Sequence, residues 1–323
     1  PGRSPSIMLF GPGRIGKTSL LRWLPSLLGA RYIPVWIDCG DATGPRDAAG
    51  LLLLLVRAIQ DQAKLMRGVS LPPLPSNALE GDPYVSLRTW LTTLRPRLQG
   101  YKVLLCLDEF QGLELRIQSN RLDVEFLATL RTLTQTHEWL TLLLSGRGSL
   151  EEMADYWPRY FNECRTHRLE CLSRDAAREL FVNPTGRKDR FPIRISDKLV
   201  NKVMKATGGH PLLIQAVGDT LTHHLNSQGR LEVQEHDLGV VFEKVLTYFD
   251  TTFQDWYREC RHRPAVQDTL RVLIREPRPR VMFDDNAVKI LLRDQLIFEQ
   301  KGFVAFRADL VRRYWALQQA GGG

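Results

Sequence analysis

The chain has 323 residues, enough for two or three domains with a sizeable core. Its hydrophobic content of 43% and charged content of 25% are ordinary for a globular protein, and the longest aliphatic run, LLLLLV at 51–56, is too short to span a bilayer. The net charge of +8 permits contact with nucleic acid but does not identify a partner.

The cysteine count bears on the cellular compartment. Five cysteines are an odd number, which argues against a disulfide framework and for buried thiols in a reducing environment. No signal peptide is visible, so we expect a cytoplasmic protein. The chain begins with Pro1 rather than Met and ends in GGG, so we expect the natural protein to extend beyond this sequence.

A phosphate-binding loop follows the first apolar run. SIMLF at 6–10 precedes GPGRIGKTSL at 11–20, and apolar residues at helical spacing come next. This strand, loop and helix context distinguishes a P-loop of the form G-x-x-x-x-G-K-[ST] from a chance glycine-rich turn. We expect Lys17 to reach the β- and γ-phosphates of a nucleotide and the Thr18 hydroxyl to ligate Mg²⁺. The predicted nucleotide-binding residues here are Gly11, Pro12, Gly13, Arg14, Ile15, Gly16, Lys17, Thr18 and Ser19.

The third predicted strand ends in two carboxylates. After a strand at 32–40 and helices near 47–67 and 84–98, the run KVLLCLDEF at 102–110 has the character of a buried parallel strand. We expect Asp108 to hold Mg²⁺ together with Thr18, and Glu109 to polarise the water that attacks the γ-phosphate. A glutamate directly after the aspartate favours ATP over GTP, because the catalytic group of a GTPase-type switch usually lies elsewhere in the sequence.

Two further strands complete a five-stranded parallel sheet, at 140–148 and 167–172. Ligands of such α/β sheets bind beyond the carboxyl ends of the strands, where Ser145 and Arg147 lie. We predict that Ser145 lines the nucleotide site and that Arg147 senses the γ-phosphate, because a guanidinium can bridge two phosphate oxygens. The alternative is that Arg147 is a surface arginine in a loop.

From Ser173 onward the strand signals stop. SRDAARELF at 173–181 and SDKLVNKVMKAT at 196–207 predict capped amphipathic helices. The second ends at GGHP, where Gly208 or Gly209 can adopt the left-handed conformation and Pro211 can begin the next helix. We divide the chain into a P-loop domain at 1–172, a helical lid at 173–258 and a winged helix at 259–320.

The winged-helix prediction rests on two helices and a hairpin. Amphipathic helices are predicted at 264–275 and 285–295, and LIFEQKGFVAF at 296–306 alternates on both sides of a turn at Gly302. Its basic residues either contact DNA phosphates, or the module packs on the lid and binds no DNA, since the second helix has few polar groups suited to reading bases. These basic residues are Arg271, Arg275, Lys289, Arg293, Lys301 and Arg307.

Four segments together resemble a known family. FGPGRIGKTSLL, LLCLDEFQGLE, LLLSGRGSL and ATGGHPLLIQ, in this order, resemble the STAND class of signal-transduction P-loop ATPases, which are relatives of AAA+ proteins and of archaeal ATPases with a DEFQ motif. The resemblance implies that Gly209, His210 and Pro211 form a G-x-P motif whose proline packs on the adenine. It also implies that Arg147 is the sensor arginine and that the fourth strand lies between the third strand and the P-loop strand.

The resemblance implies a switch that is closed with ADP and that opens and self-associates with ATP. Sensor and effector domains are then expected outside this sequence, with an output such as antiphage defence or transcription control. Our first hypothesis is therefore a regulatory switch with slow, Mg²⁺-dependent ATP hydrolysis. The alternative is a DNA-acting AAA+-like ATPase, such as a replication-origin or transposition regulator, with DNA-stimulated hydrolysis.

Overall fold

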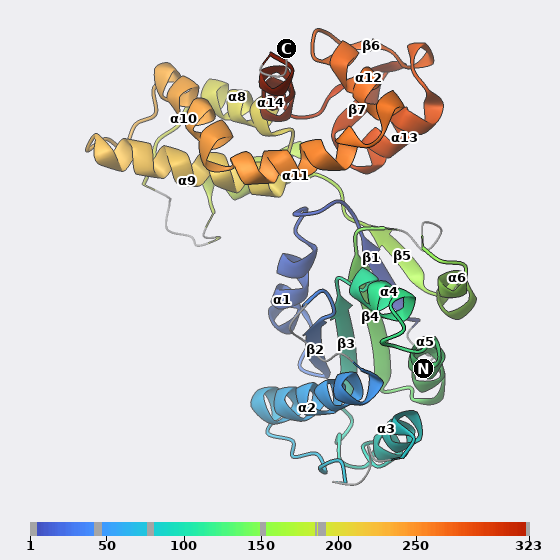
Figure 1. The fold of residues 1–323 in the computed structure, drawn as a ribbon. Helices are drawn as coiled ribbons and strands as arrows, with labels where there is room; N and C mark the ends of the chain where they lie inside the picture. Colours follow the sequence, from blue (N-terminus) through green and yellow to red (C-terminus); the bar gives the residue numbers. More distant parts are fainter. Residues whose placement is uncertain are drawn as a thin grey trace. The chain divides into compact units, whose positions relative to one another are not determined.

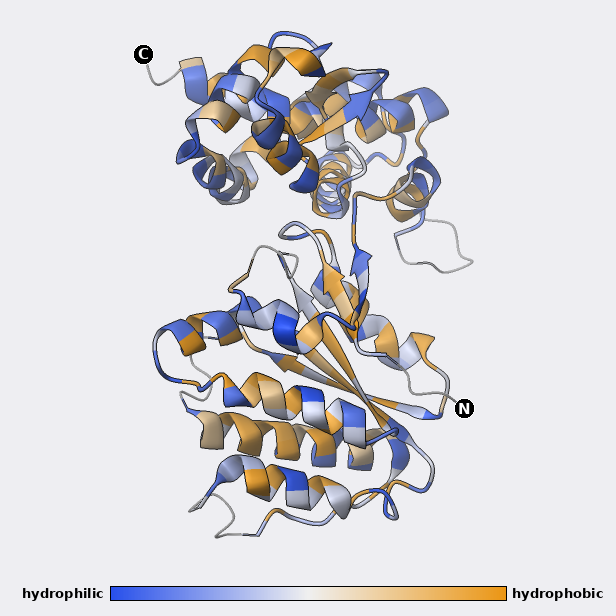
Figure 2. Ribbon diagram, turned by 90° about the vertical axis from the view of Figure 1, so that its right-hand side faces the viewer, coloured by the Kyte–Doolittle hydropathy of each residue, from blue (hydrophilic) through white to orange (hydrophobic). Residues whose placement is uncertain are grey.

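The chain divides into two compact units, with the boundary between Leu169 and Glu170 (Figure 1). The computed structural model describes residues 5–41, 47–75, 81–148, 153–184, 186 and 192–320. The first unit is a sheet between helices, and its hydrophobic strands are the orange centre of that unit in Figure 2. The second unit is mainly helical.

The sheet of the first unit confirms the predicted five-stranded parallel arrangement. Its order is β2-β3-β4-β1-β5, so β4 lies between β3 and the P-loop strand β1, as the family resemblance implies. The strands are β1 (Ile7–Phe10), β2 (Tyr32–Asp38), β3 (Lys102–Asp108), β4 (Leu140–Gly146) and β5 (Arg165–Arg168).

The last strand differs from its prediction at 167–172. β5 begins at Arg165 and ends at Arg168, because it pairs only with the four residues of β1, from Ile7 to Phe10. All four residues of β5 are exposed, so hydrophobic periodicity gives no sign of where this strand begins.

Helices cover both faces of the sheet. Successive strand residues point to opposite faces, and the apolar ones fall into two clusters: Leu9, Leu104 and Leu143 pack with α1, while Met8 and Leu105 belong to the large core shared with the other helices. These helices are α1 (Lys17–Leu27), α2 (Ala48–Arg67), α3 (Pro83–Thr92), α4 (Gln111–Gln118), α5 (Glu125–Thr136) and α6 (Tyr156–Phe161).

Helix α3 is shorter than predicted. It ends at Thr92, and residues 93–100 form turns instead of extending the helix to 98. Pro96 explains the difference, since proline lacks an amide hydrogen and disfavours helical geometry at the residue before it.

The second unit contains the predicted capped helices. The Ser173 hydroxyl accepts a hydrogen bond from the Ala176 amide at the start of α7, Gly208 ends α8 with φ of 58°, and Pro211 opens α9. Its helices are α7 (Arg174–Val182), α8 (Asp197–Thr207), α9 (Pro211–Ser227), α10 (Glu235–Tyr248), α11 (Asp250–Arg261), α12 (Pro264–Leu273), α13 (Asp285–Arg293) and α14 (Asp309–Ala320).

The predicted helix, helix and hairpin order is present at the end of the chain. Strands β7 (Ile297–Gln300) and β8 (Phe303–Phe306) join through Lys301 and Gly302, whose φ values of 51° and 77° suit a tight hairpin turn. A short strand β6 (Arg278–Pro279) pairs with β8, and the 3₁₀ helix η2 (Arg280–Met282) follows it. The assignment of this part to the winged-helix class stays a prediction.

One hydrophobic core runs through the second unit. It joins residues of α7 to α10 with residues of α11 to α14; Phe253 stacks on Tyr314, for example, with ring centroids 5.0 Å apart. The predicted lid boundary at 258 falls inside α11. The division of this unit into a lid at 173–258 and a winged helix at 259–320 therefore stays a prediction, and the two parts share one core.

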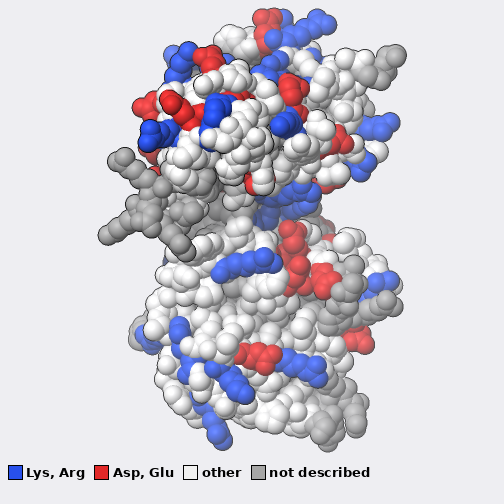
Figure 3. Space-filling model, turned by 90° about the vertical axis from the view of Figure 1, so that its left-hand side faces the viewer, with Lys and Arg blue, Asp and Glu red and all other residues white. Residues whose placement is uncertain are grey.

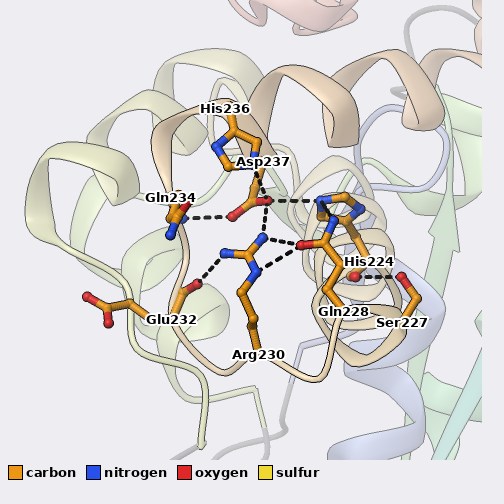
Figure 4. Close-up of polar contacts among 8 residues, drawn as sticks. All are labelled: His224, Ser227, Gln228, Arg230, Glu232, Gln234, His236 and Asp237. Atoms are coloured by element: carbon orange, nitrogen blue, oxygen red, sulfur yellow. Dashed lines mark hydrogen bonds and ion pairs between the residues drawn. The ribbon is translucent and has the colours of Figure 1, made fainter.

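A buried carboxylate links the end of α9 to the start of α10 (Figure 4). Asp237 has no exposed surface, and it accepts hydrogen bonds from His224 Nε2 at 2.9 Å, Arg230 Nη2 at 2.7 Å and the Gln234 amide at 2.8 Å. Burial by itself raises the pKa of Asp237, but the hydrogen bonds from Arg230, Gln234 and His224 outweigh it and lower the pKa to about 2.

Replacing Asp237 by asparagine is expected to destabilise the second unit by about 3 kcal/mol, because the partly buried Arg230 loses its counter-ion. The folded pKa of about 2 lies below the ordinary 3.8, so this stabilisation is complete above roughly pH 4 and is lost as the pH falls through 2. Urea unfolding at pH 7 and at pH 3 measures both effects. Asp219→Asn is the control, since Asp219 is exposed on α9; equal unfolding midpoints for the two variants would contradict the prediction.

Candidate nucleotide site

The P-loop occupies the turn between β1 and α1, as its sequence predicts. Gly16 precedes α1 with φ of 102° and ψ of 14°, a left-handed conformation that favours glycine. Gly16 has no side chain that could cap the first amide groups of α1. This suits the binding of an anion by these amides at the positive end of the helix.

Lys17 is folded back onto the loop that precedes it. Its Nζ donates hydrogen bonds to the carbonyl oxygens of Gly11 and Pro12, both at 2.8 Å, and the residue is 4% exposed. Burial is the largest influence on the Lys17 ammonium and lowers its pKa, while Glu109 acts in the opposite direction. A buried ammonium at the loop is the feature needed to neutralise phosphate charge.

Thr18 and Asp108 meet beneath the loop. The Thr18 hydroxyl donates to Asp108 Oδ2 at 2.6 Å, and the indole Nε1 of Trp36 reaches the same oxygen at 3.3 Å. A hydroxyl and a carboxylate are hard oxygen donors of the kind Mg²⁺ prefers, and nucleotide phosphates and water usually complete such a site. The pair therefore fits the predicted magnesium site, and Thr18 and Asp108 would hold the ion.

Glu109 follows Asp108 in a left-handed conformation with φ of 50°. Its amide donates to Asp108 Oδ1 at 3.1 Å, and its Oε2 accepts a hydrogen bond from Gln111 Nε2. Both predicted carboxylates thus lie together at the carboxyl end of β3. The role of Glu109 as the base stays a prediction.

Ser145 and Arg147 lie at the neighbouring end of β4. Ser145 is fully buried, and its hydroxyl has no hydrogen-bond partner among the residues that the structure describes. The Arg147 guanidinium lies beside the P-loop, because a Cβ built on Gly13 would be 3.2 Å from Arg147 Cζ. Both predicted residues are therefore in the site, and their roles stay predictions.

The first P-loop glycine also contacts the end of the unit. The Leu169 amide donates to the Phe10 carbonyl at 2.7 Å, and a Cβ on Gly11 would lie 2.6 Å from the Leu169 carbonyl oxygen. A larger side chain does not fit at Gly11 without moving this backbone, so the glycine is required for close packing as well as for the loop.

Four polar contacts of the first unit are absent from the sequence prediction. Gln111, the last letter of DEFQ, contacts Glu109, and Trp36 contacts Asp108. Glu114 on α4 is buried and accepts hydrogen bonds from Tyr156 at 2.8 Å and from the Trp157 indole, which fixes α6 against α4. The DEFQ pattern itself was a signal for Gln111; the other three contacts join residues far apart in the sequence.

The predicted adenine motif lies in the second unit. At both Gly208 and Gly209 a Cβ would clash with backbone oxygens, those of Arg307 at 2.5 Å and Leu172 at 2.6 Å. The ring of His210 packs against Trp256 with centroids 5.1 Å apart. The TGGHP segment is therefore tightly fixed within its own unit, and contact of Pro211 with adenine stays a prediction.

The described residues contain neither a cluster of metal-ligating side chains nor a helix suited to cross a membrane. Within them, no group of three or more His, Cys, Asp or Glu side chains is placed to hold a metal ion. Also within them, no helix combines the length and apolar character needed to cross a membrane.

The fold of the first unit and a family model that matches it point to the same class of protein. The model of the AAA domain family matches residues 2–154, the part of the chain that contains the P-loop and the two carboxylates. The sheet order and the helices around it are those of an α/β P-loop NTPase. Together, the AAA domain match and the Walker-type fold support ATPase activity.

Solved structures resemble the chain over nearly its full length. The Walker-type ATPase PABY2304 of Pyrococcus abyssi superposes with a TM-score of 0.67 at 16% identity, over 97% of this chain and 91% of that one. The Orc1 protein of Aeropyrum pernix, solved in complex with DNA, gives 0.52 at 13%, over 98% and 88%. A RuvB variant of Thermotoga maritima gives 0.51 at 13%, over 97% and 87%. At these identities the likeness shows the fold alone.

The comparison with curated proteins finds no significant match.

Proposed function

We propose that the protein is a regulatory ATPase switch, the central nucleotide-binding module of a STAND-type signalling or defence protein. It binds ATP or ADP, hydrolyses ATP slowly with Mg²⁺, and self-associates when ATP is bound. The proposal favours this switch over a DNA-acting ATPase because of one observation, the local pairing of the cations at residues 264–320.

Those cations are largely engaged by neighbouring carboxylates. Lys289 lies 2.7 Å from Asp285, Arg271 lies 3.0 Å from Asp268, and Arg293 lies 2.9 Å from Asp294. On the face drawn in Figure 3, positive and negative side chains of the second unit are interspersed. Binding to DNA depends on cations that are available to replace the counter-ions of phosphates.

The helix expected to face DNA is also acidic at its start. Asp284 caps α13 by accepting a hydrogen bond from the Ala287 amide at 2.8 Å, and Asp285 begins the helix. Asp285 is paired with Lys289 and Arg280, so this end of the helix offers the phosphate backbone little net positive charge. This charge distribution suits contact with protein better than contact with a nucleic acid.

In the proposed reaction, each residue at the carboxyl ends of β3 and β4 has a separate task. The loop backbone and Lys17 bind the phosphates. Thr18 and Asp108 would hold Mg²⁺, which would supply charge neutralisation at the phosphate oxygens. Glu109 accepts a proton from the attacking water, and Arg147 stabilises the charge on the γ-phosphate oxygens. Gln111 donates to one carboxylate oxygen of Glu109, so it orients this base.

The proposal predicts that the protein retains ADP through purification. Denaturing freshly purified protein and separating the released nucleotide by chromatography should yield close to one ADP per chain. An empty site with rapid exchange of added nucleotide would contradict a locked switch and indicate a freely cycling ATPase.

A second candidate, a DNA-acting AAA+-like ATPase, is favoured by the net charge of +8. The switch proposal predicts that duplex DNA changes the ATPase rate less than about twofold at low salt. Strong stimulation, with DNA affinity that falls steeply as salt rises, would replace the switch by the second candidate.

A further inference from the structure

The carboxylate of Asp108 is held by donors from three directions. Its Oδ2 accepts from the Thr18 hydroxyl at 2.6 Å and from Trp36 Nε1 at 3.3 Å, and its Oδ1 accepts from the Glu109 amide at 3.1 Å. Asp108 is 1% exposed, so these contacts fix the plane of a buried carboxylate. Thr18 and Glu109 belong to the two sequence motifs, whereas Trp36 comes from β2.

The position of Trp36 follows from the sheet. In the register of β2 and β3, Trp36 lies opposite Cys106, two residues before Asp108. The neighbouring residues Val35 and Ile37 point into the large core, so the indole points to the other face, where α1 packs. Strand β2 is at the edge of the sheet, and an indole there covers a side that no further strand protects.

Helix α1 also contacts the indole. Arg22 Cζ lies 5.2 Å from the centre of the Trp36 ring, a cation–π distance. Arg22 is one helical turn beyond Thr18, so both project from one face of α1. Thr18 reaches Asp108 directly, and Arg22 reaches it through Trp36. The contacts form a closed set among α1, β2 and β3.

We infer that Trp36 is a positioning residue for the magnesium site: its indole N–H orients the Asp108 carboxylate, and its ring shields that carboxylate from solvent at the sheet edge, with Arg22 holding the ring in place. The inference rests on the proposed function, since Asp108 has this task only in a nucleotide-hydrolysing site. Outer partners of a metal ligand act in this way, by fixing the orientation of the ligand.

The test is Trp36→Phe, which removes the N–H and keeps an aromatic ring. Affinity for a fluorescent ADP analogue is measured first in EDTA, and then the Mg²⁺ concentration for half of the magnesium-dependent change is determined. We expect EDTA affinity within about twofold of the parent and a half-saturating Mg²⁺ concentration raised about tenfold. The matched control is Trp23→Phe, because Trp23 is also a tryptophan of the first unit but is 64% exposed on α1; it should leave both values unchanged.

A second variant keeps the test decisive if Trp36→Phe fails to fold. Arg22→Gln loosens the ring without removing its N–H, so we expect a twofold to threefold rise in half-saturating Mg²⁺. Unchanged Mg²⁺ dependence in the folded variants, or an equal shift in Trp23→Phe, overturns the inference while the proposed function stands. Failure of the parent protein to bind nucleotide at any Mg²⁺ concentration overturns the proposed function instead.

Discussion

Lys17→Ala is expected to abolish measurable nucleotide binding, with affinity lower by at least about 100-fold, or about 2.7 kcal/mol. Two losses combine in this variant. The ammonium that neutralises phosphate charge disappears, and so do its hydrogen bonds to the Gly11 and Pro12 carbonyls, which hold the loop in its present curl. Titration with a fluorescent ADP analogue measures the change.

The control for this variant is Lys64→Ala, which removes an exposed lysine from α2 and should leave affinity unchanged. Circular dichroism establishes that both variants are folded. A Lys17→Ala protein that is folded and binds ADP within tenfold of the parent would show that the nucleotide does not occupy this loop.

The second large effect is expected from Glu109→Gln. Glutamine keeps the size of the side chain and can still meet Gln111, but it cannot accept a proton at neutral pH. We expect kcat to fall by about 10²-fold to 10³-fold, a typical contribution of a general base. Nucleotide binding should stay within about threefold of the parent, so the variant accumulates in its ATP-bound form.

Single-turnover hydrolysis of radiolabelled ATP separates this chemical step from product release. Glu125→Gln, an exposed substitution on α5, is the control and should hydrolyse ATP at the parent rate. If Glu109→Gln hydrolysed ATP as fast as the parent, another group would be the base. The variant could then not be used to accumulate the ATP-bound, self-associated state.

The parts of the site that the sequence predicts are those set by local order. The P-loop residues Gly11 to Ser19 follow β1, and Asp108 and Glu109 lie at the carboxyl end of β3. Both strands consist mainly of continuous apolar runs. A parallel strand followed by a loop places its last residues at the ligand-binding edge wherever the strand lies in the sheet. The motif and the strand pattern together were therefore sufficient to predict that Thr18 and Asp108 lie close together. The Thr18 hydroxyl oxygen is 2.6 Å from Asp108 Oδ2.

The contacts that the sequence does not predict join distant residues by side chain alone. Trp36 and Asp108 are 72 positions apart, and Trp157 and Glu114 are 43 positions apart. A tryptophan in an apolar strand is expected in a core, and nothing in its neighbours indicates that the indole N–H meets a carboxylate. Only the register of β2 on β3 brings them together.

The predicted bounds of β5 were wrong for a related reason. Strand prediction relies on a buried face, and the exposed residues Arg165 to Arg168 have none. Their pairing is dictated by the length of β1, which is a property of the partner and not of the segment itself. The apolar residues that suggested the strand, Leu169 and Leu172, lie beyond it.

Leu169, the last residue of the first unit, packs on Gly11, so the chain leaves this unit directly beside the P-loop. A shift of Gly11 on phosphate binding would therefore displace the Leu169 peptide group, at which the first unit ends. Such a displacement would pass directly from one backbone segment to the other, and it would need no chain of side-chain contacts through the sheet. Strand β1, which leads into the P-loop, pairs with β5, after which the chain leaves the first unit. The phosphate-binding loop and the exit of the chain from this unit therefore lie side by side.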